Sequence, residues 1–506
     1  MPLLPAPSGV MDHRPLKILL VASEAVPFAK TGGLADVTGA LPRELARLGH
    51  SVTLVIPRYG SIEKTAAGFK PWLRLAVPTA SGRIDATIEQ GQLGDSGVRV
   101  LAVRHDPYFD RTGLYQESGA DYPDNLERFG FFCRAVLELL PALRKVSAWT
   151  PDLLHAHDWQ TALSVVYLKT LYVKSLSMKR IGTLFTVHNM GYQGLFPPKE
   201  FSKAGLGAEL FTMKTLEFHG SLNLLKGGLV FADFLNTVSP TYSREIQTPE
   251  FGFGLDGVVR ERRDRMVGIV NGIDTEVWNP VTDPHLPSRY SLSDLAGKRM
   301  CKAELQRELG LPIRDVPVLA AVSRFTQQKG LDLVAEVLPE LMELDLQVAL
   351  LGTGDPQYEA MFRSLQSRHP DKIGLRIGFD DALAHRIEAG GDIFLMPSRY
   401  EPCGLSQQYS LRYGTVPIVR RTGGLADTVV PYTPRAVREG RATGFVFSQA
   451  MAESLLSVVL LALRVYADRA EWSSLMGAGM STDVSWTRPA RSYVELYRTA
   501  LELRGR

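Results

Sequence analysis

The chain has 506 residues, of which 45% are hydrophobic and 22% charged, and its formal net charge at pH 7 is +3. The length exceeds what one hydrophobic core supports and predicts two or three domains, and the composition is that of a soluble globular protein. The small net charge excludes an electrostatic case for nucleic acid binding. Three cysteines without close spacing argue against a disulfide framework or structural zinc site and predict a reducing, cytoplasmic compartment.

The N-terminal segment, residues 1–15, is rich in proline and has no apolar core behind a basic start. We therefore expect a disordered leader and not a secretory signal. The longest apolar run, Leu455 to Leu463, is far shorter than the roughly 20 residues that a membrane helix needs. We expect no membrane partner.

The first half of the chain alternates strand-like and helix-like segments. Strands are predicted over residues 17–22, 51–57, 98–103, 152–156 and 183–187, and helices over residues 34–48, 125–140 and 161–172. Residues 57–98 are less regular. This alternation predicts parallel strands joined by right-handed crossover helices, and hence a doubly wound α/β sheet.

The second half repeats this pattern after a proline-containing crossover at residues 271–287. Strands are predicted over residues 318–322, 347–351, 374–378, 393–396 and 416–419, and helices over residues 331–344, 357–368, 382–389 and 406–412. A final amphipathic helix is predicted over residues 489–503. The expected domains are an N-terminal Rossmann-like domain (16–267), a C-terminal one (268–485), and a C-terminal helix (486–506) that packs back on the N-terminal domain.

One short phrase occurs twice, as residues 31–36 and again as residues 422–427, and both copies read Thr-Gly-Gly-Leu-Ala-Asp. A Gly-Gly pair after a strand allows a tight turn and brings backbone N–H groups and a helix N-terminus close to an anion. Lys30 precedes the first copy and Arg421 the second. A single such loop is more often a mere tight turn, but the duplication favours two α/β units that face each other across a cleft.

Ligands of open α/β sheets bind beyond the carboxyl ends of the strands. The residues that follow the predicted strands are mostly charged, imidazole or amide side chains and glycines, namely Lys30, His155, His157, Asp158, His188, Asn189, Arg324, Lys329, Gly352, Gly354, Glu401 and Thr422. Basic side chains and glycine loops imply a phosphate-bearing ligand, and the others imply a partner rich in hydroxyl groups. A nucleotide sugar combines both.

Each of these signals also has a simpler interpretation. His155, His157 and Asp158 are metal-ligand types, but no further ligand at a sensible spacing accompanies them, and the chain has no Asp-x-Asp motif, so we expect no metal. The loop with Arg324 and Lys329 is equally compatible with a solvated surface. Glu401 precedes a predicted helix, whose N-terminus we expect to hold it ionised. Cys403 is a packing residue more readily than a nucleophile.

The chain contains, in order, the phrases KTGGLADV, HAHDWQTAL, TVHNMGYQG, TVSPTYSREI, IVNGID, SRFTQQKG, LLGTGD and PSRYEPCGL. Together they resemble the bacterial glycogen synthase family over everything except about the first fifteen residues. The resemblance implies a retaining glycosyltransferase with two Rossmann-like, doubly wound domains facing a central cleft, the GT-B type. It further implies transfer of glucose from ADP-glucose to the non-reducing end of an α-1,4-glucan, without a metal or other cofactor.

The same resemblance implies catalytic roles for four residues. Arg324 and Lys329 would stabilise the charge on the departing ADP, Glu401 would contact the sugar, and His188 would turn its backbone carbonyl toward the reacting carbon. Retention arises either by double displacement with Glu401 as nucleophile or by front-face attack. Contacts with the diphosphate, the glucose or the glucan are implied for Lys30, Gly32, Gly33, Tyr122, Asp158, Asn189, Asn271, Gly354, Cys403, Gly404, Leu405, Thr422, Gly423 and Gly424.

Two other classes of protein fit the predicted fold. A retaining transferase that uses UDP-sugars and a small acceptor, such as a sucrose or trehalose-type synthase, is one, although the KTGGL and E-x-C-G-L phrases point away from it. A non-catalytic glucan-binding protein is the other, and it would be expected to have lost some of the matched positions.

Overall fold

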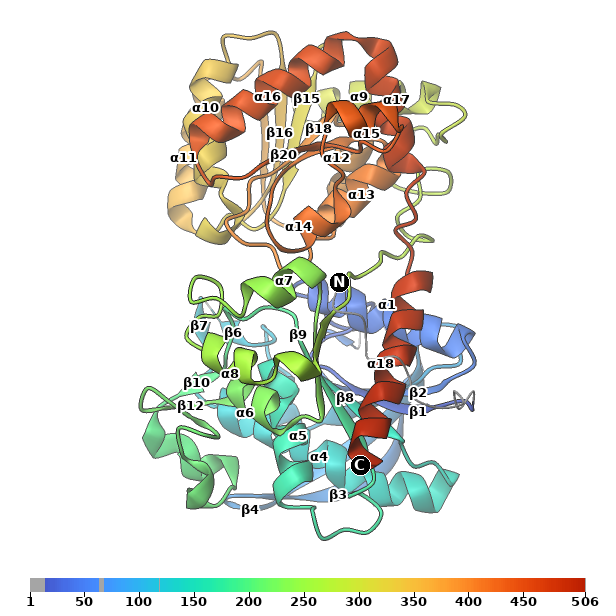
Figure 1. Ribbon diagram of the computed structural model, residues 1–506, viewed down its shortest axis with the longest axis vertical. Helices are drawn as coiled ribbons and strands as arrows, with labels where there is room; N and C mark the ends of the chain where they lie inside the picture. Colours follow the sequence, from blue (N-terminus) through green and yellow to red (C-terminus); the bar gives the residue numbers. More distant parts are fainter. Residues whose placement is uncertain (1–13, 63–67, 118, 506) are drawn as a thin grey trace. The chain divides into compact units, whose positions relative to one another are not determined.

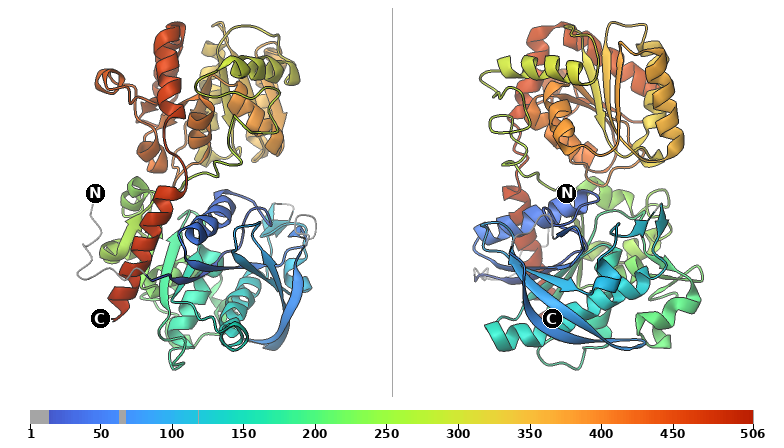
Figure 2. Two further views of the ribbon diagram at one scale, coloured as in Figure 1. Left: turned by 90° about the vertical axis from the view of Figure 1, so that its right-hand side faces the viewer. Right: turned by 180° about the vertical axis from the view of Figure 1, so that it is seen from behind.

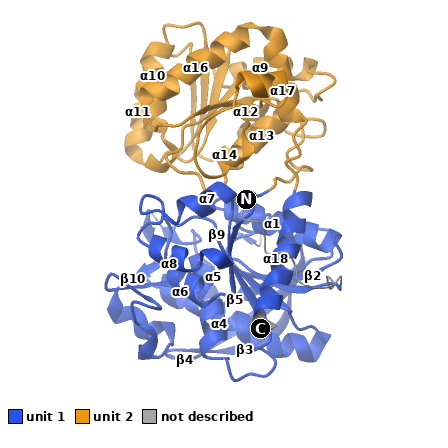
Figure 3. Cartoon of the chain, in the orientation of Figure 1, with its two compact units in different colours: residues 1–271, 486–506 blue, residues 272–485 orange. Residues whose placement is uncertain are grey.

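The computed structural model describes residues 14–62, 68–117 and 119–505 (Figures 1 and 2). The chain forms two compact units, one of residues 1–271 with 486–506 and the other of residues 272–485 (Figure 3). Apart from its last two residues, the expected leader lies outside the described residues. Among the described helices, none has the length and apolar character required to cross a membrane.

The boundary between the units lies after Asn271, and not after residue 267 as the sequence predicted. The reason is that β14 (Met266–Gly268) pairs in parallel with β13 (Phe234–Thr237) of the first sheet. The N–H of Ile269 continues this pairing by donating to the carbonyl oxygen of Thr237 at 2.9 Å. The chain therefore leaves unit 1 only after this edge strand ends.

Unit 1 is built, in the described part of the chain, on a nine-stranded sheet with the order β14-β13-β9-β8-β1-β2-β5-β4-β3. The remaining strands are β1 (Lys17–Val21), β2 (Ser51–Pro57), β3 (Lys70–Thr79), β4 (Gly82–Gln92), β5 (Arg99–Arg104), β8 (Leu153–His157) and β9 (Gly182–Val187). The strands from β14 to β5 are parallel, whereas β4 and β3 form an antiparallel hairpin at one edge. The sequence did not predict this hairpin, because β3 is partly exposed along most of its length and alternates weakly.

Helices cover both faces of this sheet (Figure 1). They are α1 (Gly33–Arg47) and α18 (Thr487–Gly505) on one face, and α4 (Asn125–Ser147), α5 (Trp159–Thr170) and α6 (Leu224–Phe231) on the other. The crossovers β1–α1–β2 and β8–α5–β9 run in opposite directions along the sheet, so right-handed connections place α1 and α5 on opposite faces. α18 returns from the end of the chain and packs on α1 and β9.

Unit 2 has, within the described residues, a six-stranded parallel sheet with the order β17-β16-β15-β18-β19-β20. Its strands are β15 (Val318–Val322), β16 (Gln347–Gly352), β17 (Ile373–Ile377), β18 (Ile393–Met396), β19 (Val416–Arg420) and β20 (Phe445–Phe447). Helices α10 (Leu331–Leu341), α11 (Pro356–Arg368) and α16 (Ala452–Ala467) pack around one hydrophobic core. Helices α9 (Ala296–Glu308), α12 (Asp381–Gly390) and α13 (Ser406–Tyr413) cover the opposite face.

The parallel part of each sheet reverses its strand order at one point, between β1 and β8 in unit 1 and between β15 and β18 in unit 2. At such a switch point the two flanking crossovers leave toward opposite faces, and the loops after the two strands border a crevice in which α/β proteins bind ligands. The loops after these four strands carry residues singled out from the sequence, among them Lys30, Asp158, Arg324, Lys329 and Glu401.

Candidate active site

The switch point of unit 2 brings together two of the predicted catalytic residues. Lys329 follows β15 and Glu401 follows β18, and the Lys329 Nζ donates to the Glu401 Oε2 at 2.6 Å. The Ser398 hydroxyl donates to the same oxygen at 2.9 Å. Only 7% of the Glu401 side chain is exposed, so this is a largely desolvated, charge-assisted pair.

The loop that carries Glu401 is fixed by its neighbours. Arg420, at the end of β19, donates its Nε to the Ser398 carbonyl oxygen at 2.7 Å and its Nη2 to the Arg399 carbonyl oxygen. Arg399 in turn forms a bidentate pair with Asp332 of α10, at 2.7 and 2.5 Å. The Glu401 carboxylate is held by Lys329 and Ser398, and among the described residues no N–H of α13 bonds to it. Direct bonds from Lys329 and Ser398 thus hold this carboxylate, and an effect of the charge at the helix N-terminus on Glu401 stays a prediction.

The second glycine loop packs directly under the Glu401 loop. The N–H of Gly424 donates to the carbonyl oxygens of Glu401 and Pro402, at 3.1 and 3.2 Å. A Cβ atom on Gly423 would overlap the Glu401 carbonyl oxygen, and one on Gly424 would overlap that of Cys403. Gly423 also has a φ of +44°, which favours glycine. These glycines permit close packing, and the N–H of Gly424 is bonded to protein and not held ready for an anion.

The other predicted residues of unit 2 lie on the same edge of the sheet. Arg324 is exposed and shares the loop after β15 with Lys329. Gly354 follows β16 beside that loop, where a Cβ would overlap the carbonyl oxygen of Phe325. Gln407 of α13 donates to the carbonyl oxygens of Cys403 and Gly404 at 3.1 and 3.0 Å. Cys403 is buried and Leu405 half-buried, while Thr422 lies buried before the glycine pair.

In unit 1, the first glycine loop is organised by Glu24, a residue that the sequence analysis missed. Its carboxylate accepts the N–H of Thr31 at 2.5 Å, the Thr31 hydroxyl at 2.6 Å and the N–H of Gly32 at 3.3 Å. The Tyr115 hydroxyl adds a bond of 2.6 Å. Burial raises the pKa of Glu24 above its usual range, and these donors oppose the rise. Glu24 closely follows β1, so the rule of charged residues after strands could have found it.

The side chains of this first loop are open to solvent. Lys30 is exposed and its Nζ pairs with the Asp36 carboxylate at 2.8 Å. A Cβ atom on Gly32 would meet nothing within 4 Å, and Gly33 begins α1. The loop therefore offers ligand access at Gly32, although its first N–H groups already bond to Glu24.

The other side of the unit 1 switch point carries Asp158 and His188. The Asp158 carboxylate accepts the backbone N–H of His188 at 2.7 Å, and burial raises the pKa of Asp158 to about 7. His188 shares a hydrogen bond of 2.9 Å with His157, and burial lowers the pKa of His188 to about 3. Asp158 has a φ of +56°, a strained conformation for a residue other than glycine. This carboxylate is thus held by neutral groups next to a neutral imidazole.

His155, in β8 shortly before Asp158, has a structural role. Its ring nitrogens lie 2.9 Å from the Tyr497 hydroxyl of α18 and 2.7 Å from the Thr186 hydroxyl. Burial holds the pKa values of His155 and His157 well below their usual range. Both nitrogens of His155 are used within the protein, and the bond to Tyr497 fixes α18 on the sheet.

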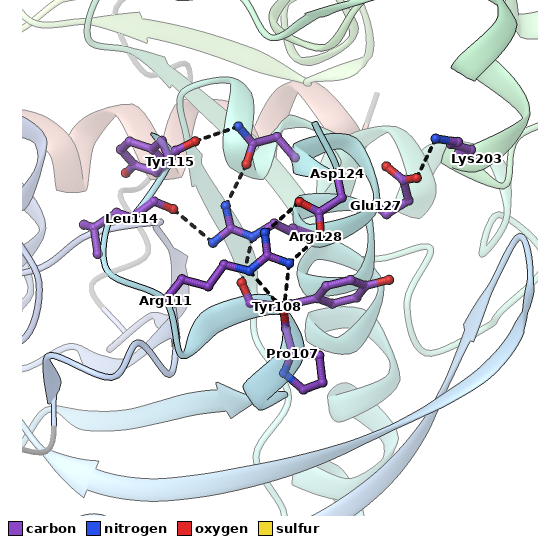
Figure 4. Close-up of polar contacts among 10 residues, drawn as sticks. Pro107, Tyr108, Arg111, Leu114, Tyr115, Asp124, Glu127, Arg128 and Lys203 are labelled. Carbon is purple, nitrogen blue, oxygen red and sulfur yellow. Dashed lines mark hydrogen bonds and ion pairs between the residues drawn. The ribbon is translucent and has the colours of Figure 1, made fainter. Parts of the chain in front are cut away.

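The Tyr122 ring packs against the side chains of two arginines. The guanidinium groups of Arg111 and Arg128 lie 4.7 and 4.8 Å from the centre of its ring. Arg128 is buried and donates to the Tyr108 and Leu114 carbonyl oxygens, at 2.7 and 3.0 Å, while Arg111 pairs with Asp124 (Figure 4). Elsewhere in unit 1, the Asn189 side chain accepts the N–H of Gly191 at 2.9 Å, and Asn271 is the buried last residue before unit 2.

Comparison with known proteins identifies the family. Residues 17–261 match the starch synthase catalytic domain, and residues 304–474 match the group 1 glycosyl transferases. A glycogen synthase of Anaeromyxobacter dehalogenans (strain 2CP-C) is 49% identical, over 96% of this chain and 99% of its own length. The chain belongs to the glycogen and starch synthase family. Another glycogen synthase of the family, from Desulforudis audaxviator (strain MP104C), is 47% identical over 97% of this chain and 98% of its own.

Solved structures agree with this family assignment. The catalytic domain of starch synthase IV from Arabidopsis thaliana, bound to ADP and acarbose, superposes with a TM-score of 0.89 at 32% identity, over 97% of this chain and 100% of that one. Sucrose-phosphate synthase from Thermosynechococcus elongatus, at 19% identity and a TM-score of 0.59, shares the fold. The expected family, the GT-B type of fold with its two doubly wound domains, and glycosyltransferase activity are confirmed.

Proposed function

We propose that this chain transfers glucose from ADP-glucose to the non-reducing end of an α-1,4-glucan, with retention of configuration. Membership of the glycogen and starch synthase family supports a nucleotide-sugar donor and a glucan acceptor. The observation that carries the proposal is the buried Lys329–Glu401 pair at the switch point of unit 2, with Arg324 on the same loop. This arrangement supports the proposal, because a carboxylate accepts hydrogen bonds from sugar hydroxyl groups and neighbouring cations attract a diphosphate.

The proposed chemistry is largely electrostatic. As the bond between glucose and ADP breaks, negative charge grows on the β-phosphate. Lys329 and Arg324 stabilise that charge more strongly in the transition state than in the bound donor, which lowers the barrier. Neither a metal ion nor another cofactor takes part in this proposal, since side chains supply the positive charge.

The ion pair favours the front-face route to retention. Lys329 and Ser398 both donate to the Oε2 of Glu401, and these bonds draw electron density from the carboxylate and weaken it as a nucleophile. In the front-face route a phosphate oxygen takes the proton of the attacking hydroxyl, and Glu401 orients the sugar. A glucosyl adduct trapped on Glu401 would overturn this route in favour of double displacement.

We assign the remaining roles to unit 1 by the family resemblance. Lys30 and the glycines after it contact the phosphates, and Tyr122, Asp158 and Asn189 contact the glucose or the glucan. His188, whose pKa burial lowers to about 3, acts as a neutral group beside the glucose and not as a cation. A cytoplasmic location stays a prediction.

A transfer assay tests the proposal. Purified protein is given glycogen with either ADP-glucose or UDP-glucose, each with and without a chelator, and the Glu401→Gln variant serves as control. We expect rapid transfer from ADP-glucose that the chelator does not affect. Preference for UDP-glucose would favour the other retaining transferases, and no transfer from either donor would favour a glucan-binding protein.

A further inference from the structure

A group of metal-ligand side chains lies in unit 2 among residues to which no catalytic or substrate-binding role has been given. Within the described residues, His285, Asp381 and His385 each offer one ligand atom, and these atoms lie within 4.8 Å of one another. Asp381 and His385 are four residues apart on α12 and so share one face of the helix. His285 comes from the irregular segment that opens unit 2.

The buried member of the group, His385, is fixed from two directions. Its ring stacks on the indole of Trp278 with centroids 3.7 Å apart and planes at 9°, and Tyr409 stacks on the same indole at 3.7 Å and 10°. Its Nδ1 lies 2.7 Å from the carboxylate of Asp283, which is also buried. The rotation of this imidazole is therefore set before any ligand arrives.

Asp283 determines which nitrogen of His385 is available. A carboxylate accepts hydrogen bonds, so Nδ1 carries the proton and Nε2 keeps its lone pair. His385 is 1% exposed, and among the described residues no hydrogen bond reaches its Nε2. Asp283 also accepts the Tyr413 hydroxyl at 2.5 Å and the backbone N–H of His285 at 2.9 Å, so one carboxylate positions both histidines.

We propose that His285, Asp381 and His385 bind a divalent transition-metal ion of the Zn²⁺ type, with Asp283 as the outer carboxylate. Two imidazoles and one carboxylate are a common ligand set for such ions, and an imidazole that donates its other N–H to a carboxylate is the usual arrangement around them. Ligands about 2.1 Å from a tetrahedral ion lie about 3.4 Å apart. His285 and Asp381 are exposed and can rotate to close the remaining distance.

The bound ion would join two parts of unit 2 that are distant in sequence. It links α12 to the segment around His285, which precedes α9 and has little regular structure of its own. A ligand that binds only the folded state stabilises it by RT ln(1 + L/Kd), where L is its free concentration and Kd its dissociation constant. The ion therefore has a structural role, and the proposal does not depend on the transfer reaction.

Metal titration of the full-length, untagged protein tests the proposal. Protein freed of metal with a chelator is titrated with Zn²⁺ by calorimetry and with Co²⁺ by visible absorption, and its thermal unfolding is followed with and without Zn²⁺. We expect one equivalent to bind, a Co²⁺ absorption band of low-symmetry coordination, and a higher unfolding temperature with Zn²⁺.

The variants His285→Ala and Asp381→Asn change exposed side chains, so their folding is not at risk. Each should weaken binding at least about 10-fold. His369→Ala, which removes a partly exposed histidine elsewhere in unit 2, should bind as the unchanged protein does. The proposal would be overturned if no ion bound stoichiometrically. It would also be overturned if His285→Ala and Asp381→Asn bound the ion as tightly as His369→Ala and the unchanged protein do.

Discussion

The phrase Thr-Gly-Gly-Leu-Ala-Asp begins a helix in each unit, yet its glycines have different surroundings. In unit 1 the space beside Gly32 is open, and the loop is held from behind by the buried carboxylate of Glu24. In unit 2 Gly423 and Gly424 press against the carbonyl oxygens of Glu401 and Cys403. The same six residues thus border open space in one unit and are closely packed in the other, so a repeated motif does not imply repeated surroundings.

The two switch points also hold their carboxylates differently. In unit 1, Glu24 and Asp158 are bonded to backbone N–H groups and hydroxyls, and burial raises the pKa of both. In unit 2, Glu401 is paired with the cation of Lys329. Unit 1 should therefore respond to pH, whereas unit 2 should respond to loss of its cation.

The largest difference in stability between the two sites is expected when the lysine of each is replaced. Lys329→Ala leaves the buried carboxylate of Glu401 without its cation and should lower the free energy of unfolding by about 3 kcal/mol. Lys30→Ala breaks an exposed pair with Asp36 and should cost about 0–1 kcal/mol. Urea unfolding of both variants measures the difference. Equal costs would show that the Lys329 pair is not desolvated in solution.

The glycines themselves provide the second comparison. Gly424→Ala places a methyl group against the Cys403 backbone and should cost about 1–3 kcal/mol, with loss of transfer activity as the Glu401 loop moves. Gly32→Ala is the matched control, because φ there is −162° and the space is open. It should change the unfolding free energy by less than about 0.5 kcal/mol. A Gly32→Ala variant as unstable as Gly424→Ala would contradict the distinction.

A smaller effect is expected from pH. Burial raises the pKa of Asp158 from 3.8 to about 7, so its contribution to stability is fully present below pH 4 and is lost as the pH rises through 7. Asp158→Asn cannot ionise, and its unfolding free energy relative to the unchanged protein should rise by on the order of 1–2 kcal/mol between pH 6 and pH 8. Paired unfolding curves across this range give the answer, and a constant difference would show that Asp158 keeps its ordinary pKa.

Sequence patterns predicted the structure correctly where a short local run of residues determines a secondary-structure element. β2, β15 and β18 have the predicted bounds, because each is a short apolar run between turn residues. Lys329 and Glu401 could be predicted because they follow such strands, and ligands of α/β sheets bind beyond the carboxyl ends of the strands. Their direct contact depends on the strand order, in which β15 and β18 are neighbours although they are far apart in the chain.

What the sequence did not reveal depends on tertiary contacts. Glu24 is an ordinary acidic residue until the fold buries it beneath the glycine loop. The pairing of Asp283 with His385 joins residues 102 positions apart, which no local pattern encodes. The local sequence around Gly423 predicted a loop that binds an anion, and it could not reveal that this glycine packs against the backbone of Glu401.

The most direct test of the central claim compares catalysis with nucleotide binding in Glu401→Gln. We predict that kcat falls by at least about 100-fold, while the Kd for ADP, measured by calorimetry, stays within about threefold of the unchanged protein. Glu336→Gln, on an exposed position of α10, is the matched control and should leave both unchanged. A kcat close to that of the control would contradict the assignment of the Lys329–Glu401 pair as the site of transfer.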